Sequence, residues 1–218
     1  MAIHSHEAFR KKLSPHEKYF CDTSFVIDCY ENPGLAANKL KSDLLSNNCT
    51  LIINSVVRNE LLHYLRKAIC ESFFSESNSK ICQPIHVSYN DTKNYDWLKQ
   101  VHMNGYGRYL EAALGKNGEV LNSEYEQYVA GTVYWSAGKL NLNNGTLEWN
   151  NLNRLMGHYG LDSSDSMMLN FACTTKDFKG LISNDCDFRY AKTHQQDFDI
   201  IIPEKYMNMP VDLDWQNR

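Results

Sequence analysis

Acidic side chains fall where predicted strands end and predicted helices begin along this sequence. They are Asp22, Glu60, Asp165, Asp185 and Asp187. Short apolar strands that alternate with helices predict a parallel sheet. The carboxyl ends of parallel strands meet at one edge, which is where such sheets bind ligands. We therefore expect acids from four separate segments to converge at that edge.

Gathered carboxylates need a counter-ion, because like charges a few ångström apart disfavour ionisation. Carboxylate oxygens without sulfur or imidazole suit hard cations, and Mg²⁺ and Mn²⁺ prefer such ligands together with water. A bound dication activates water and stabilises charge on a phosphoryl centre, and two-metal sites clamp both the attacking and the leaving oxygen. The reaction class that these acids predict is metal-dependent phosphodiester hydrolysis.

Each acid also has a purely structural interpretation. An aspartate at a strand end commonly caps a helix or forms a turn, and a glutamate in a first helical turn commonly interacts with the helix dipole. Asp162 competes with Asp165 for one metal role, or caps the helix that follows. Asp28 fits a helix surface or the rim of the site. On the residues alone, the joint placement leaves both interpretations open.

The elements that must position these acids are short strands and amphipathic helices. Compact apolar runs predict strands at 18–22, 50–54, 180–188 (breaking into an acidic turn) and 198–203. Helical spacing predicts helices over 35–47, 56–74, about 92–114, 120–138, 147–159 and 163–176. Thr23 and Ser24 are suitable caps for a further helix after the first strand, and Ser55 for the helix 56–74. Together they predict an α/β fold with helices on both faces of a parallel sheet.

Composition places the chain among ordinary globular domains. Apolar residues make up 43% and charged residues 22% of the 218 residues, which excludes fibrous and disordered classes. No apolar run approaches the roughly 18 residues needed to cross a bilayer, and the polar N-terminus has no signal-peptide pattern. The net charge of −4 argues against broad electrostatic binding of nucleic acid. Seven widely spaced cysteines without a CxxC pair favour a reducing cytoplasm, where we expect the protein.

Four sequence segments resemble the motifs of the PIN-domain family, in the family's order. They are FCDTSFVID (20–28), INSVVRNELLHY (53–64), LDSSDSMMLNFA (161–172) and LISNDCDF (181–188). Within that family, the segments look most like the VapC toxin ribonucleases of toxin–antitoxin pairs. The motifs lie in roughly half of the chain, within residues 18–74 and 160–203.

The resemblance implies a three-layer α/β/α sandwich and Mg²⁺- or Mn²⁺-dependent cleavage of single-stranded or structured-loop RNA. It implies four metal-binding acids: Asp22, Glu60, Asp165 and Asp185. Asp187 would be an accessory acid, and the hydroxyls of Ser24 and Ser183 would orient neighbouring carboxylates. A family member of this kind implies an antitoxin protein that blocks the site, and a homodimer.

The chain departs from a minimal family member by its length. We expect residues 1–17 to be a polar lead-in with a mobile start, and 18–218 to form one PIN-like domain with a helical insertion at about 85–158. Aromatic residues in this insertion could stack on unpaired bases, or could fill the interface between an added helical layer and the core.

Two other functions are compatible with these residues. The fold could serve as a binding module that holds RNA or protein without cutting, although such modules usually lose one or more of the acids. It could also form a metal-dependent hydrolase for a small phosphate ester, which would need a closed pocket.

Overall fold

The computed structural model describes residues 2–76, 107–135, 149–159, 161–175, 178–190 and 198–208. These residues form two compact units, one from 1–58 with 128–218 and the other from 59–127. The sheet belongs to the first unit, and helix α4 (Ser55–Glu76) begins in the first unit and continues into the second.

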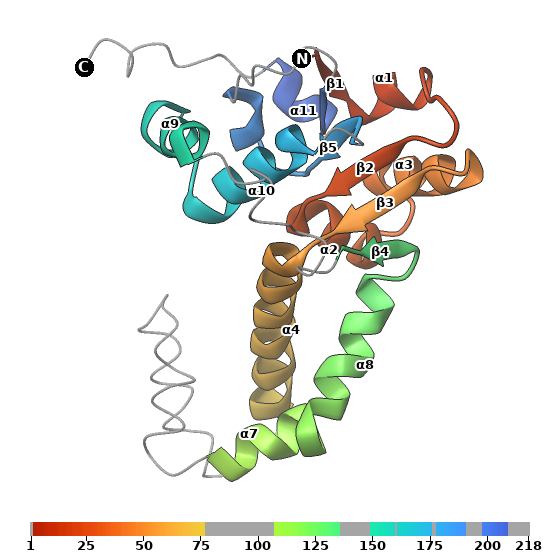
Figure 1. The fold of residues 1–218 in the computed structure, drawn as a ribbon. Coiled ribbons are helices and arrows are strands. Elements are labelled where there is room, and N and C mark those ends of the chain that lie inside the picture. The colour runs from red at the N-terminus through yellow and green to blue at the C-terminus, as the bar shows by residue number, and fades with distance from the viewer. Residues whose placement is uncertain are drawn as a thin grey trace. The chain divides into compact units, whose positions relative to one another are not determined.

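A six-stranded sheet organises the first unit, in the order β1-β6-β5-β2-β3-β4. Its strands are β1 (Ala2–Ser5), β2 (Lys18–Cys21), β3 (Thr50–Ile53), β4 (Thr132–Tyr134), β5 (Gly180–Ile182) and β6 (Asp199–Ile202). Every neighbouring pair is parallel (Figure 1). The predicted parallel sheet is therefore confirmed.

Different helices cover the two faces of the sheet. Successive side chains of a strand point to opposite faces. In β2, the buried Tyr19 packs edge-to-face on Phe9 of α1 (His6–Arg10), with ring centroids 5.5 Å apart. The next residue, Phe20, packs on Phe171 of α10 (Ser163–Thr174), also at 5.5 Å. These contacts put α1 and α10 on opposite faces, and the predicted α/β architecture with helices on both faces is confirmed.

The remaining helices are divided between the two units. In the first unit they are α2 (Thr23–Glu31), α3 (Ala36–Ser46), α9 (Trp149–Tyr159), α11 (Glu204–Met207) and the short 3₁₀ helix η3 (Asp187–Tyr190). In the second unit they are α7 (Gly107–Leu114), the 3₁₀ helix η1 (Lys116–Gly118) and α8 (Glu119–Tyr128), whose last residue already belongs to the first unit. Within the described ranges, no helix is long and apolar enough to cross a membrane.

The expected polar lead-in at 1–17 is wrong for its first residues, which are ordered parts of the sheet unit. Residues 2–5 form β1, which pairs with β6 in the register Ala2 to Asp199 and Ser5 to Ile202. The sequence did not indicate a strand here because its partner lies nearly the whole chain away and the four residues carry little apolar periodicity. The following residues form α1, capped by the Ser5 hydroxyl.

The predicted insertion at 85–158 falls largely outside the described residues. Its described part contains helices α7, α8 and α9, as expected, but also β4, which pairs with β3. The predicted helix over 120–138 is therefore wrong at its end, because residues 132–134 form a strand of the sheet. Whether one domain carries an insertion remains a prediction.

Candidate active site

Asp22 lies where β2 ends and α2 begins, and its side chain is almost fully buried, at 4% exposure. Its backbone N–H donates to the carbonyl of Ile182 at 2.9 Å, which holds it beside the end of β5. Its carboxylate caps α2 by accepting a hydrogen bond from the Thr23 N–H at 2.7 Å. The cap of this helix is therefore Asp22, rather than the Thr23 or Ser24 that we expected. The N-terminus of a helix stabilises a negative charge at this position.

Two serine hydroxyls converge on the same carboxylate oxygen of Asp22. Ser24 Oγ donates to Asp22 Oδ2 at 2.5 Å and Ser183 Oγ donates to it at 2.7 Å. The two hydroxyl oxygens lie 3.2 Å apart. Hydrogen bonds to a carboxylate are stronger than neutral ones and favour its ionised form. Asp22 is thus a buried, oriented carboxylate at the carboxyl edge of the sheet.

The same hydroxyls also bind the loop that follows β5. Ser183 Oγ accepts a hydrogen bond from the Asp185 N–H at 2.8 Å, and Ser24 Oγ accepts one from the Asn184 N–H at 2.9 Å. Two segments about 160 residues apart in the chain are therefore joined through two side-chain oxygens. This arrangement fixes the start of the acidic loop relative to Asp22.

A compact group of potential ligands lies in that loop. Asp185, Cys186 and Asp187 each offer one possible metal-ligand atom, and these three atoms lie within 4.8 Å of one another. Among the residues that the structure describes, they are the group of His, Cys, Asp or Glu side chains that lies this close together. The Asp187 N–H donates to Asp185 Oδ1 at 3.0 Å. Burial, and then the hydrogen bond and charge of Asp187, raise the pKa of the Cys186 thiol. The anionic atoms of the group are therefore carboxylate oxygens, which suit a hard cation.

Asp162 and Asp165 have different positions at the start of α10. Asp162 is exposed and caps the helix, with its carboxylate accepting a hydrogen bond from the Asp165 N–H at 2.8 Å. Asp165 is half-buried in the first helical turn. Neither belongs to the group around Asp185, although both lie in the same compact unit. A metal role for either residue stays a prediction.

Glu60 is half-buried on α4 and belongs to the second compact unit. The helix that carries it is capped by Asn54, whose Oδ1 accepts hydrogen bonds from the N–H groups of Val56 and Val57 at 3.0 and 3.2 Å. Ser55, which we expected to cap this helix, is its first residue. The participation of Glu60 in a site with the other acids stays a prediction.

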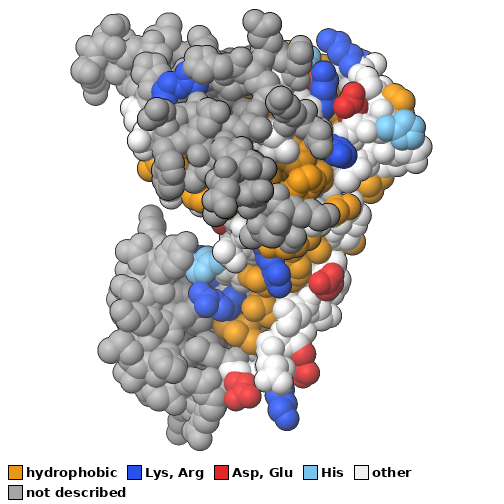
Figure 2. All heavy atoms as spheres, viewed as in Figure 1, with side chains coloured by type: hydrophobic (Ala, Val, Ile, Leu, Met, Phe, Trp, Pro, Cys, Tyr) orange, Lys and Arg blue, Asp and Glu red, His pale blue; other side chains and the backbone are white. Residues whose placement is uncertain are grey.

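Charges on the visible surface are dispersed. In the view of Figure 2, the described Lys and Arg side chains lie separately, with Asp, Glu and apolar side chains between them. The described part of this face therefore carries no broad basic field, in agreement with the net charge of −4.

Comparisons with known proteins give one structural similarity. No family model matches the sequence, and no curated protein matches it. Among solved structures, the chain is similar to the crystal structure of VapBC2 from Rickettsia felis bound to a DNA fragment from their promoter. The sequence identity is 14% and the TM-score 0.46, over 85% of this chain and 98% of that chain. At this level of similarity, function has to be inferred from the chain's own residues.

Proposed function

We propose that the protein is a metal-dependent endoribonuclease that hydrolyses RNA phosphodiester bonds. The observation that carries this proposal is the buried carboxylate of Asp22, held by two serine hydroxyls at the end of β2. One of these hydroxyls also holds the backbone of Asp185. A carboxylate that only capped a helix would not need both hydroxyls, whereas a metal ligand must be oriented.

The donor chemistry fits Mg²⁺ or Mn²⁺. The residues that would hold the ion are Asp22, Glu60, Asp165 and Asp185, with Asp187 and Asp162 as accessory acids. When bound, such an ion supplies an activated water and stabilises the charge that develops on the phosphoryl oxygens. Asp22 and Asp185 would bind, and Ser24 and Ser183 would keep their carboxylates oriented.

The biological setting is a further part of the proposal. The resemblance of the motifs to VapC toxins suggests a toxin whose antitoxin blocks the site, with a basic side chain placed among the acids, and a homodimer. A reducing cytoplasm is proposed from the wide spacing of the seven cysteines, which form no CxxC pair.

Cleavage of a mixed pool of small RNAs tests this function. The wild type should cut with Mn²⁺ or Mg²⁺ and should not cut with EDTA. Residues that hydrogen-bond to metal ligands typically contribute 10- to 100-fold to metal affinity or activity. Asp22→Asn removes a proposed ligand itself, so we expect it to lower the cleavage rate by at least about 100-fold. The matched control is Asp28→Asn on the same helix, because the Asp28 carboxylate accepts an exposed hydrogen bond from Asn32. This control should cut like the wild type.

Two results would contradict the proposal. Cleavage that persists in EDTA or in Asp22→Asn would show that the acids are not the catalytic site. Absence of cleavage, combined with calorimetry that detects no metal binding, would favour the binding module. That module would hold RNA or protein without cutting.

A further inference from the structure

We propose that His6 is a positioning residue of the acid site, acting on Asp22 and Asp185 through Ser183. This inference rests on the proposed metal-dependent function and assigns part of its geometry to the N-terminal segment. No motif in the sequence singles out His6, and the expected mobile lead-in would have left it without a role.

His6 is buried at 1% exposure at the start of α1. Its Nε2 lies 3.1 Å from the carbonyl oxygen of Ser183. A carbonyl oxygen only accepts hydrogen bonds, so Nε2 carries the proton and donates it. The ring also packs edge-to-face on Phe25 of α2, with centroids 5.9 Å apart. The imidazole is thus held in one orientation between α2 and the end of β5.

The hydrogen bond from His6 fixes one side of the peptide unit between Ser183 and Asn184. On the other side of the same unit, the Asn184 N–H donates to Ser24 Oγ at 2.9 Å. A trans peptide is planar, and its C=O and N–H point in opposite directions. Because the plane is rigid, the two bonds restrain its rotation from both sides.

Ser183 transmits this orientation to the acids. Its own N–H donates to the Ile201 carbonyl at 3.0 Å, and the residue is fully buried. With its backbone held on both sides, its hydroxyl reaches Asp22 Oδ2 at 2.7 Å and accepts from the Asp185 N–H at 2.8 Å. A rotation of the Ser183–Asn184 peptide would move both acidic segments relative to each other.

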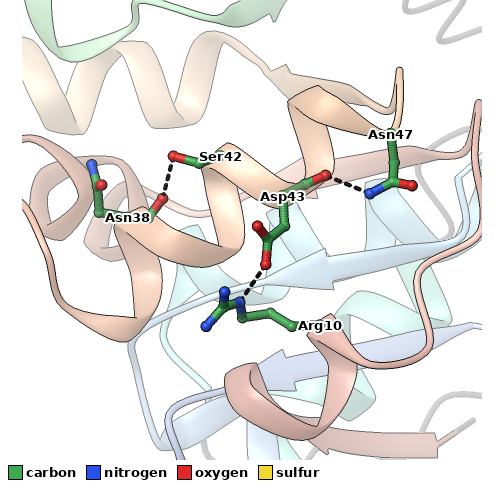
Figure 3. A network of polar contacts seen from close by, with 5 residues as sticks. All are labelled: Arg10, Asn38, Ser42, Asp43 and Asn47. Atoms are coloured by element: carbon green, nitrogen blue, oxygen red, sulfur yellow. Dashed lines mark hydrogen bonds and ion pairs between the residues drawn. The ribbon is translucent and has the colours of Figure 1, made fainter.

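The N-terminal segment is anchored well enough to act as a support. Besides the pairing of β1 with β6, Arg10 Nε donates to Asp43 Oδ2 of α3 at 2.5 Å. Figure 3 shows this ion pair beside the Asn47 side chain, which donates to the Asp43 carbonyl. Phe9 packs on Tyr19. His6 therefore lies between fixed contacts on both sides along the chain.

Substitutions at His6 separate positioning from simple packing. In His6→Gln the amide nitrogen can stand in for Nε2, whereas in His6→Asn the amide is too short and in His6→Leu the donor is absent. Mn²⁺ affinity, measured by calorimetry, should fall by about tenfold in His6→Leu and His6→Asn and stay within about threefold in His6→Gln, as for groups that orient metal ligands. His4→Gln on the preceding strand is the control, because His4 contacts Asp199 rather than the site.

A readout without metal tests the same contact directly. In the metal-free protein, hydrogen exchange at the Asn184 and Asp185 amides should be faster in His6→Leu than in the wild type and unchanged in His4→Gln. Should His6→Leu fail to fold, His6→Asn against His6→Gln gives the same comparison.

The outcomes distinguish this inference from the proposed function. If the wild type binds no Mn²⁺, both the proposed metal-dependent function and the inference about His6 are overturned. If the wild type binds Mn²⁺ while folded His6→Asn or His6→Leu binds it equally well, His6 is only a core histidine and the inference alone is overturned.

Discussion

Single residues determine how the acidic segments meet, and Ser183 joins them most directly. Its hydroxyl binds the carboxylate of Asp22 and the backbone of Asp185, and it has no access to water. A threonine could make the same two bonds, whereas an alanine would leave a buried carboxylate oxygen and a backbone N–H without this partner.

We predict that Ser183→Ala lowers the free energy of unfolding by about 1–3 kcal/mol, the cost of removing a hydrogen bond from a buried polar group. Ser183→Thr should retain most of the stability. Urea unfolding in EDTA measures this without any contribution from metal. The control is Ser42→Ala in α3, whose hydroxyl bonds an exposed carbonyl and should change stability by less than about 0.5 kcal/mol. Equal stability of Ser183→Ala and wild type would contradict the importance of this link.

His6 gives the fold a dependence on pH. Burial lowers its pKa from 6.5. The hydrogen bonds that the imidazole donates to the backbone carbonyls of Ser183 and Ile201, and the charges of Glu7 and Asp28, act in the opposite direction and raise it. Below about pH 6.5 the unfolded chain binds a proton that the folded protein does not yet bind. The free energy of unfolding must therefore fall as the pH drops through this window, and level off below the folded pKa.

The variant His6→Gln isolates this contribution. Urea midpoints measured between about pH 7.5 and pH 5 should fall more steeply for the wild type than for His6→Gln, which lacks this imidazole but keeps the other seven histidines of the chain. Parallel curves for the two proteins would mean that His6 does not remain neutral when folded.

At the scale of secondary-structure elements, the sequence located most strands and helices but misplaced the caps of α2 and α4, whereas Asp162, one of the expected alternatives, does cap α10. Consecutive polar residues such as Asn54 and Ser55 can each cap a helix. Which of them does so depends on where the preceding strand stops. β3 ends at Ile53, the last residue that pairs with β4, one residue after its pairing with β2 ends. Pairing between distant segments decides this, and local sequence does not report it.

The same reason explains why the sequence did not predict the N-terminal strand β1. β1 is four residues long, and its parallel partner β6 lies at the opposite end of the chain. Without that strand and α1, His6 could not be recognised as a neighbour of Ser183. By contrast, the sequence did predict that the hydroxyls of Ser24 and Ser183 orient the acids, because each serine lies in the same motif as an acid, Asp22 or Asp185.

The cap of α4 can be tested separately. Asn54→Ala should lower the free energy of unfolding by about 1 kcal/mol, because two helical N–H groups lose the side-chain oxygen that they bind. Asn54→Ser keeps an acceptor and should cost only a few tenths of that amount. If urea unfolding shows the two variants to be equally stable, Asn54 is not the functional cap of this helix.

At the scale of the whole molecule, the parallel sheet was predictable because buried strands are continuous apolar runs. Three strands illustrate this: KYFC, TLII and DIII have three consecutive buried residues each. The division of the chain into two compact units was not predictable, since α4 continues from one unit into the other as an uninterrupted helical pattern. Glu60 lies on that helix, so its role depends on more than local structure.

The central claim is that Asp22 and Asp185 together bind a divalent metal ion. Anomalous scattering from crystals soaked in Mn²⁺ locates such an ion directly. We expect a peak about 2.1 Å from a carboxylate oxygen of each residue, the distance at which Mg²⁺ takes oxygen ligands. The peak should disappear in Asp22→Asn. A manganese peak away from Asp22, or no peak in the wild type at millimolar Mn²⁺, would contradict the account.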